Sequence, residues 1–128
     1  MSTSPPVIAC WVDPSIGEAG AHLALKKRFE GVSNRITQWH YFDNGDPLRG
    51  LFDANPNAAL VVIMSGQLAH QHVSTISHLS NLHSVYVFCG NKQKYQSLPQ
   101  EEPKVRGIFT SEDDLFQQMS THLQRDFP

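Results

Sequence analysis

The sequence predicts an α/β domain built on a five-stranded parallel sheet that is doubly wound, with helices on both faces. The longest unbroken apolar run, Ala59–Met64, is rich in β-branched side chains, which is typical of a strand buried on both faces. Shorter runs of the same kind alternate with segments of helical periodicity. Because crossovers between parallel strands are right-handed, few topologies remain, and we expect the strand order 2-1-3-4-5.

Composition and charge narrow the class of protein. The chain has 128 residues, of which 40% are hydrophobic and 17% charged, as in globular domains. We expect a single domain over residues 7–127 after a disordered lead-in, residues 1–6. A net charge of −2 without a basic block gives no support for a nucleic-acid partner. No apolar run reaches the roughly 18 residues of a membrane span, and the start lacks a signal-peptide pattern, so we expect a cytoplasmic protein that makes no membrane contact.

The first strand is expected at Val7–Val12, a β-branched run that ends at an Asp-Pro turn. A helix should follow, because apolar residues recur there at spacings of four, four and three, namely Ala21, Leu25, Phe29 and Val32. The basic triplet Lys26–Arg28 is interpreted as a solvated helix face. Gly31 lies where this helix should end.

The second strand is expected at Arg35–Phe42, where β-formers alternate imperfectly, as on the edge of a sheet. Asp46 then precedes Pro47, which is the pattern of an N-cap followed by proline at the first helical position. A short amphipathic helix should carry Leu48, Leu51 and Phe52.

The third strand, Ala59–Met64, ends at Ser65–Gly66, and the serine is expected to cap the next helix. That helix has its apolar face at Val73, Ile76 and Leu79. A fourth strand is predicted at Ser84–Cys89.

The last third of the chain should begin with one or two polar helical turns within Lys92–Ser97, followed by a loop, Leu98–Pro103. A weaker fifth strand is expected at Val105–Phe109. Ser111 and Asp114 approximate a capping box for the last helix. The apolar face of this helix consists of Leu115, Phe116, Met119 and Leu123.

No cofactor or metal site is predicted. His70 and His72 are two residues apart, a spacing that does not place both side chains on one face of a helix, and no cysteine or carboxylate accompanies them. Cys10 and Cys89 both fall in strand patterns and are interpreted as buried free thiols, although Cys89 lies near Lys92, a cation that could activate it.

Small and polar residues gather where the strands should end. Because ligands bind at the carboxyl ends of the strands in open α/β sheets, these residues are the candidate site. They are Asp13, Ser15, Gly17, Ser65, Gly66, Gln67, Cys89, Gly90 and Thr110. We expect a crevice lined by residues 13–17 and 65–68, the alternative being a shallow edge filled by its own loops.

Two parts of this edge approach known catalytic and binding motifs without matching them. Ser65–Gly66 resembles a nucleophile at a strand end, but the flanking residues do not supply the G-x-S-x-G elbow. The segment Gly17–Ala21 occupies the position of a phosphate loop, but it matches neither common glycine motif, and Glu18 would repel a phosphate.

The block Val61–Ser65, running into a loop and a helix, resembles the third conserved block of TIR domains, and the order of elements resembles response-regulator receiver domains. Both families have the flavodoxin-like fold. The segments Ile63–Gly66 and Ser84–Cys89 are also similar to small α/β domains found ahead of TPR or ADP-ribosyltransferase modules in large eukaryotic proteins. The resemblance implies a signalling or adaptor role.

The sequence departs from both families at their chemical positions. A receiver carries an acidic pair, a phosphoacceptor aspartate and a lysine where this chain has Asp13 alone, Ser65 and Thr110. An NAD-cleaving TIR domain carries a glutamate after the third strand, but residues 67–83 contain no acid. We therefore expect a non-catalytic interaction or adaptor domain whose partner is another protein or a like domain. The alternative is a sensor or NAD-processing enzyme that binds a nucleotide-like ligand at the strand ends.

Overall fold

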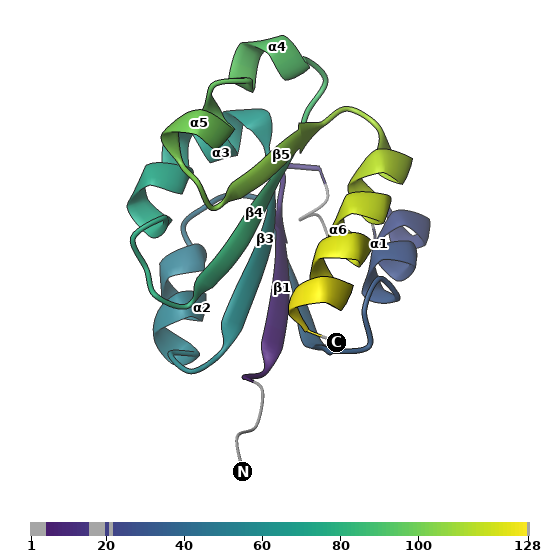
Figure 1. The fold of residues 1–128 in the computed structure, drawn as a ribbon, viewed down its shortest axis with the longest axis vertical. Coiled ribbons are helices and arrows are strands. Elements are labelled where there is room, and N and C mark those ends of the chain that lie inside the picture. Colours follow the sequence, from purple (N-terminus) through teal and green to yellow (C-terminus); the bar gives the residue numbers. More distant parts are fainter. Residues whose placement is uncertain (1–4, 16–19, 21, 128) are drawn as a thin grey trace.

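The computed structural model describes residues 5–15, 20 and 22–127. Five parallel strands form one sheet in the order β2-β1-β3-β4-β5, which confirms the predicted fold class and strand order (Figure 1). The strands are β1 (Val7–Val12), β2 (Ile36–Phe42), β3 (Ala59–Ser65), β4 (Leu82–Phe88) and β5 (Val105–Phe109).

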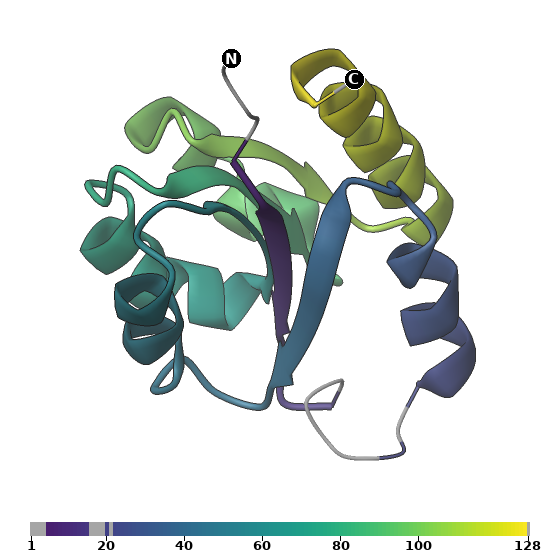
Figure 2. The same ribbon diagram turned by 90° about the horizontal axis from the view of Figure 1, so that it is seen from below.

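The helices cover both faces of the sheet (Figures 1 and 2). One face packs against α1 (Leu23–Glu30) and α6 (Glu112–Asp126). The opposite face packs against α2 (Leu48–Ala54), α3 (Gly66–Ile76) and the short α5 (Leu98–Glu101). A further single turn, α4 (Lys92–Tyr95), follows the carboxyl end of β4. No described helix is long and apolar enough to cross a membrane.

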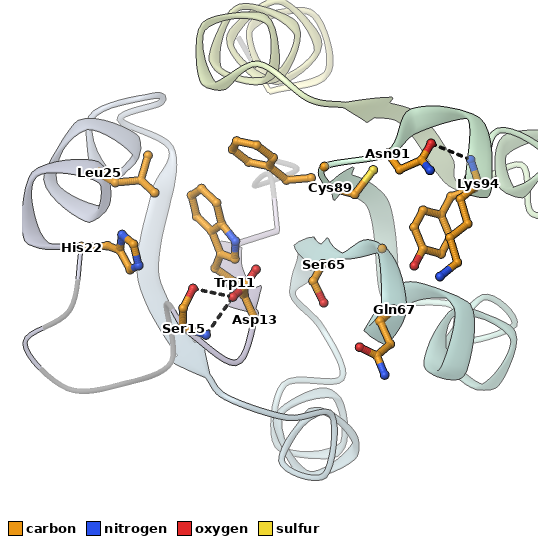
Figure 3. Close-up of a pocket in the computed structure, with 14 residues that line it drawn as sticks. Trp11, Asp13, Ser15, His22, Leu25, Ser65, Gln67, Cys89, Asn91 and Lys94 are labelled. Carbon is orange, nitrogen blue, oxygen red and sulfur yellow. Dashed lines mark hydrogen bonds between the residues drawn. The ribbon is translucent and has the colours of Figure 1, made fainter.

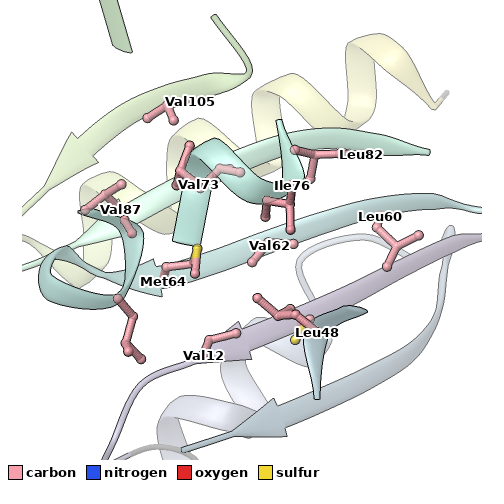
Figure 4. Packing of buried hydrophobic residues seen from close by; sticks show 14 of the residues in the cluster. Val12, Leu48, Leu60, Val62, Met64, Val73, Ile76, Leu82, Val87 and Val105 are labelled. Atoms are coloured by element: carbon pink, nitrogen blue, oxygen red, sulfur yellow. The ribbon is translucent and has the colours of Figure 1, made fainter. Parts of the chain in front are cut away.

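The central strand β3 supplies side chains to both halves of the core. Val62 and Met64 belong to the cluster under α2 and α3, where Figure 4 shows them among the side chains of those helices. Val61 and Ile63 belong to the cluster under α1 and α6. All four are fully buried, as are Val85 and Val87 on β4. The unbroken apolar run thus reflects burial on both faces, as expected of a central parallel strand.

Three strand pairs contain one extra residue on one strand, which shifts the register. On β4, Leu82 pairs with Leu60 and Ser84 with Val61, so His83 is the extra residue. On β5, Arg106 is extra in the same way, and on β2 it is Thr37. Such bulges redirect a side chain out of the regular alternation of a strand.

The basic triplet on α1 is a solvated face only in part: Lys27 and Arg28 are exposed, as predicted, but Lys26 is not, which corrects the prediction for that residue. Lys26 is buried, with its Nζ 4.7 Å from the centre of the Tyr41 ring. Arg28 donates to both Glu112 and Asp113 at 2.8 Å and so links α1 to α6. Periodicity could not show this, because long basic side chains can lay their apolar stems along a sheet while the charged head finds a partner.

Two other boundaries differ from expectation. Pro47, and not Asp46, is the N-cap of α2, and it makes no side-chain cap. Residues 98–101 form α5 where a loop was expected, because a proline in the first turn of a helix lacks only an N–H that has no intrahelical partner.

Candidate functional site

One cavity of about 620 Å³ opens at the carboxyl ends of β1, β3 and β4, and we call it the strand-end pocket (Figure 3). It lies where the strand order reverses between β1 and β3, the usual position of ligands in this architecture. Its described lining residues come from four stretches of the chain, 11–15, 22–25, 65–67 and 88–95: Trp11, Asp13, Ser15, His22, Leu25, Ser65, Gly66, Gln67, Phe88, Cys89, Gly90, Asn91, Lys94 and Tyr95. A volume of this size suits a small organic molecule.

Most of the sequence-predicted site residues meet in this pocket. Those that line it are Asp13, Ser15, Ser65, Gly66, Gln67, Cys89 and Gly90. Thr110 does not, because it lies in a separate, smaller hollow with Asp114 and Gln117 between β5 and α6. Gly17 lies outside the described residues, so its role in the crevice stays a prediction.

Among the described residues that line the pocket, Asp13 is the one with a carboxylate side chain. Its Oδ1 accepts hydrogen bonds from the backbone N–H and the hydroxyl of Ser15, both at 2.8 Å. Its own backbone N–H donates to the Phe42 carbonyl at 2.9 Å, which holds this loop against the end of β2. The turn expected from the sequence therefore fixes Oδ1 of Asp13. The other carboxylate oxygen, Oδ2, has no hydrogen-bond partner among the described residues.

Ser65 caps α3, as predicted. Its Oγ accepts a hydrogen bond from the Leu68 backbone N–H at 3.3 Å. The lone pairs of the hydroxyl therefore serve the helix, and no described base lies in hydrogen-bond contact with it. This geometry agrees with a structural cap and not with a nucleophile.

Gly66, the first residue of α3, is buried beneath the ring of Tyr95. A β-carbon at this position would overlap ring atoms of that tyrosine. The glycine thus allows the aromatic side chain to close over the start of α3. Gly66 still lines the pocket beside this ring, and its predicted contact with a ligand stays a prediction.

Sequence reasoning missed the aromatic walls of the pocket and its cation. Trp11 is 2% exposed, stacks edge-on against Phe29 with ring centres 4.9 Å apart, and lies 6.2 Å from Phe88. Lys94 places Nζ 5.5 Å from the centre of the Tyr95 ring. An aromatic residue within a predicted strand is expected to belong to the core, and α4 is too short to show helical periodicity. Only the tertiary structure therefore shows that these side chains line one cavity.

The two cysteines differ in environment. Cys10 is buried, and desolvation raises the pKa of its thiol well above the usual range, so that it stays protonated. Cys89 follows β4, is partly exposed and lines the pocket, so only Cys10 fits the prediction of two buried thiols.

The described residues contain no group of three metal-ligating side chains. His70 is exposed, and His72 packs against Gly45 on the α2 side, away from the strand-end pocket. The two histidines therefore do not converge on one point. Comparison of the chain with protein-family models, with curated proteins and with solved structures found no match. The strand order supports a flavodoxin-like fold, and no family match supports membership of the receiver or TIR families.

Proposed function

We propose that this chain is a non-catalytic binding domain that takes a nucleotide-like small molecule in the strand-end pocket. The observation that carries the proposal is the joint presence in one cavity of aromatic rings, one carboxylate and one lysine. A planar heterocycle, a hydroxylated sugar and an anionic group are the three parts of a nucleotide, and each has a chemical counterpart in the lining.

Trp11 supports the heterocycle. The structure gives its indole Nε1–H no hydrogen-bond acceptor among the described residues, although the side chain is almost fully buried and lines the cavity (Figure 3). Its Nε1 atom is not among the buried polar atoms that lack a partner, so this N–H is accessible and can donate to an acceptor atom on a ligand. A ring that carries such an atom would also pack against the exposed edge of this aromatic wall.

Asp13 and Lys94 support the polar parts of the ligand. The free Oδ2 of Asp13 is suited to accept from sugar hydroxyls, because Ser15 already occupies Oδ1. Lys94 and the N-terminus of α3 provide positive charge for an anionic group on the other side of the pocket.

The lining does not favour the alternative of an NAD-processing enzyme. Asp13 is the one carboxylate among the described residues of the pocket, and residues 67–83 on and after α3 contain none. No described nucleophile and base are hydrogen-bonded to each other in the pocket. Stabilisation of an oxocarbenium-like charge would require a carboxylate aimed at the sugar from α3.

The test is thermal unfolding of the protein with AMP, ATP and NAD, and with ribose 5-phosphate as a ligand that lacks the ring. A ligand at a hundred times its Kd should add about 2.7 kcal/mol to the free energy of unfolding. Trp11→Phe should weaken the effect by removing the N–H donor, whereas Trp39→Phe, outside the pocket, should not. Absence of any shift with all four compounds would contradict the proposal.

A second candidate is the protein-interaction role, favoured by β2. Among the described strands, this edge strand pairs with β1 alone, and none of its residues is buried, whereas every residue of β1 is. It contains no lysine and no proline, which commonly protect an exposed edge from pairing with another chain. Light scattering after gel filtration would test pairing with a like domain, and Gln38→Lys should abolish any dimer. A monomer at all concentrations would remove this candidate.

A further inference from the structure

The outer edge of β5 forms the floor of a groove, which we call the β5 groove. Among the described strands, β5 pairs with β4 alone, so its other edge has no strand beside it. Two hollows of about 350 Å³ and 210 Å³ lie along this edge and have Ile108, Phe109 and Gln118 in common. Figure 1 shows α5 on one side of β5 and α6 on the other. Gln96 and Pro99 form the wall on the α5 side, and Gln118 belongs to the α6 wall.

The backbone of β5 can pair with a further strand. The Phe109 carbonyl accepts a hydrogen bond from the Cys89 N–H at 2.9 Å, so Phe109 directs its carbonyl towards β4. In a strand, the N–H and C=O of one residue point to the same edge, and those of the next residue point to the other edge. Ile108 therefore directs both groups into the groove, while its side chain is buried in the core. Such an unpaired edge is a template for a strand from another chain.

Gly107 and Phe109 shape the floor of the groove. A β-carbon on Gly107 would lie 2.9 Å from a ring carbon of Phe109, so this ring occupies the space that a side chain would fill. The ring is partly exposed and lines both hollows. A glycine within a strand often marks the close approach of another backbone. The groove thus offers open backbone beside an aromatic ring, which suits an extended chain that carries an apolar side chain.

The two ends of the groove carry opposite charges. Arg106, the extra residue of β5, is exposed at one end, and Asp114 is exposed beside Thr110 at the other. Neither charged side chain forms an ion pair within the described part of the chain. Positions 106 and 110 are about 13 Å apart along a strand. An extended segment with an acidic side chain opposite Arg106 and a basic one four residues away would therefore pair both charges.

We propose that the β5 groove binds an extended segment of a partner protein, which adds a strand to the sheet and carries an acid and a base four residues apart. One extended segment is narrow enough for the groove, because neighbouring strands lie only about 4.8 Å apart. The β5 edge of a second copy does not fit, since it lies between the same two walls and the walls of the two copies would meet first. The groove does not include the strand-end pocket, so the two binding events can be tested separately.

The test uses two end-blocked, fluorophore-labelled peptides, Thr-Glu-Val-Thr-Val-Lys-Thr and Thr-Lys-Val-Thr-Val-Glu-Thr. The first pairs both charges if the added strand runs parallel to β5, and the second does so if it runs antiparallel. Fluorescence polarisation with the whole chain should show binding of at least one of them. Replacing the glutamate of that peptide by glutamine should weaken binding by up to about fivefold, the effect of an exposed ion pair. Lack of binding of both peptides at concentrations up to about 1 mM overturns the proposal.

A charge exchange tests whether Arg106 contacts the acid of the peptide. Arg106→Glu should weaken binding of the selected peptide and favour the version in which lysine replaces the glutamate, whereas the wild type should have the reverse preference. Arg106 is exposed, so thermal unfolding should show that the variant is folded. Lys27→Gln, exposed on α1, is the control and should bind as the wild type does. The same peptide preference in the wild type and in Arg106→Glu overturns the proposal.

Hydrogen exchange of the wild-type chain, followed by NMR, needs no variant. The bound peptide should slow exchange of the Ile108 amide and leave the amides of β2, at the opposite edge of the sheet, unchanged. Unchanged exchange at Ile108 with the peptide bound would show that the peptide does not pair with β5, and the proposal would fail. It would also fail if Ile108 became protected without peptide as the protein concentration rose, because a second copy would then occupy the groove.

Discussion

The ring of Tyr95 lies against Gly66 so closely that a β-carbon on the glycine would overlap three of its ring carbons. This contact joins α4 to the first residue of α3 and forms one wall of the strand-end pocket. The shape of the pocket therefore depends on a residue without a side chain.

Gly66→Ala should lower the free energy of unfolding by about 1–3 kcal/mol, because the new methyl group must displace the Tyr95 ring. Gly50→Ala is the matched control: a β-carbon there meets nothing within 4 Å, and the change should stabilise α2 by about 0.5–1 kcal/mol. Urea unfolding measures both. In a Tyr95→Ala background the cost of Gly66→Ala should largely disappear, and equal costs in the two backgrounds would show that the ring is not the cause.

Ile63→Ala should cost about 2–5 kcal/mol of unfolding free energy, since Ile63 is fully buried between β3 and the helices α1 and α6. Thr37→Ala on the exposed edge strand should change stability far less. Both values can be read from urea unfolding curves. A loss below about 1 kcal/mol for Ile63→Ala would contradict the central position of β3.

Stability should fall as the pH is lowered from 7 towards 5. The folded protein holds the pKa of both His83 and His122 below the ordinary value of 6.5, so in this range the unfolded chain binds more protons than the folded chain. Stability is thus complete above the unfolded pKa and is lost as the pH drops towards the folded pKa, with a slope of up to about 1.4 kcal/mol per pH unit for each histidine.

Urea unfolding at a series of pH values measures this slope. His83→Gln should reduce it by removing one of the two titrating groups, and His70→Gln, on the exposed side of α3, should leave it unchanged. A stability that rises on acidification would show that the ion pair with Asp126 outweighs the desolvation of His83.

Incubation with NAD should release no nicotinamide. The physical reason is the lack of a carboxylate in residues 67–83, together with the engagement of Asp13 by Ser15. Chromatography of the nicotinamide product checks this. Turnover that copurifies with the protein and is lost in Asp13→Asn would assign the role of the missing acid to Asp13.

Arg28→Gln should lower the melting temperature, because Arg28 forms ion pairs with Glu112 and Asp113. Its guanidinium also stacks on Phe116, with 4.7 Å between the guanidinium carbon and the ring centre. These groups are largely exposed, so salt should screen the ionic part of the effect. Melting curves at low and high salt separate the two contributions. Lys27→Gln on the same helix is the control, and an equal loss in both variants would argue against a specific link between α1 and α6.

The sequence by itself determined the order of the strands, the central place of β3 and the gathering of polar residues at one edge. These features follow from local patterns: apolar runs reveal burial, and the handedness of crossovers restricts topology. The caps at Ser65 and Ser111 were predictable for the same reason, since each involves residues only three positions apart.

The tertiary structure alone decided which side chains meet. Trp11, Lys94 and Tyr95 line one cavity, and Thr110 does not, because Tyr95 at the end of α4 lies over the first residue of α3 and β5 lies at the far edge of the sheet. Extra residues in β4 and β5 redirect His83 and Arg106, a displacement set by the pairing of distant strands. The periodicity of a sequence shows only which residues share a face of one helix or strand. Strand register and the packing of rings depend on residues far apart in the sequence, so only the tertiary structure could show them.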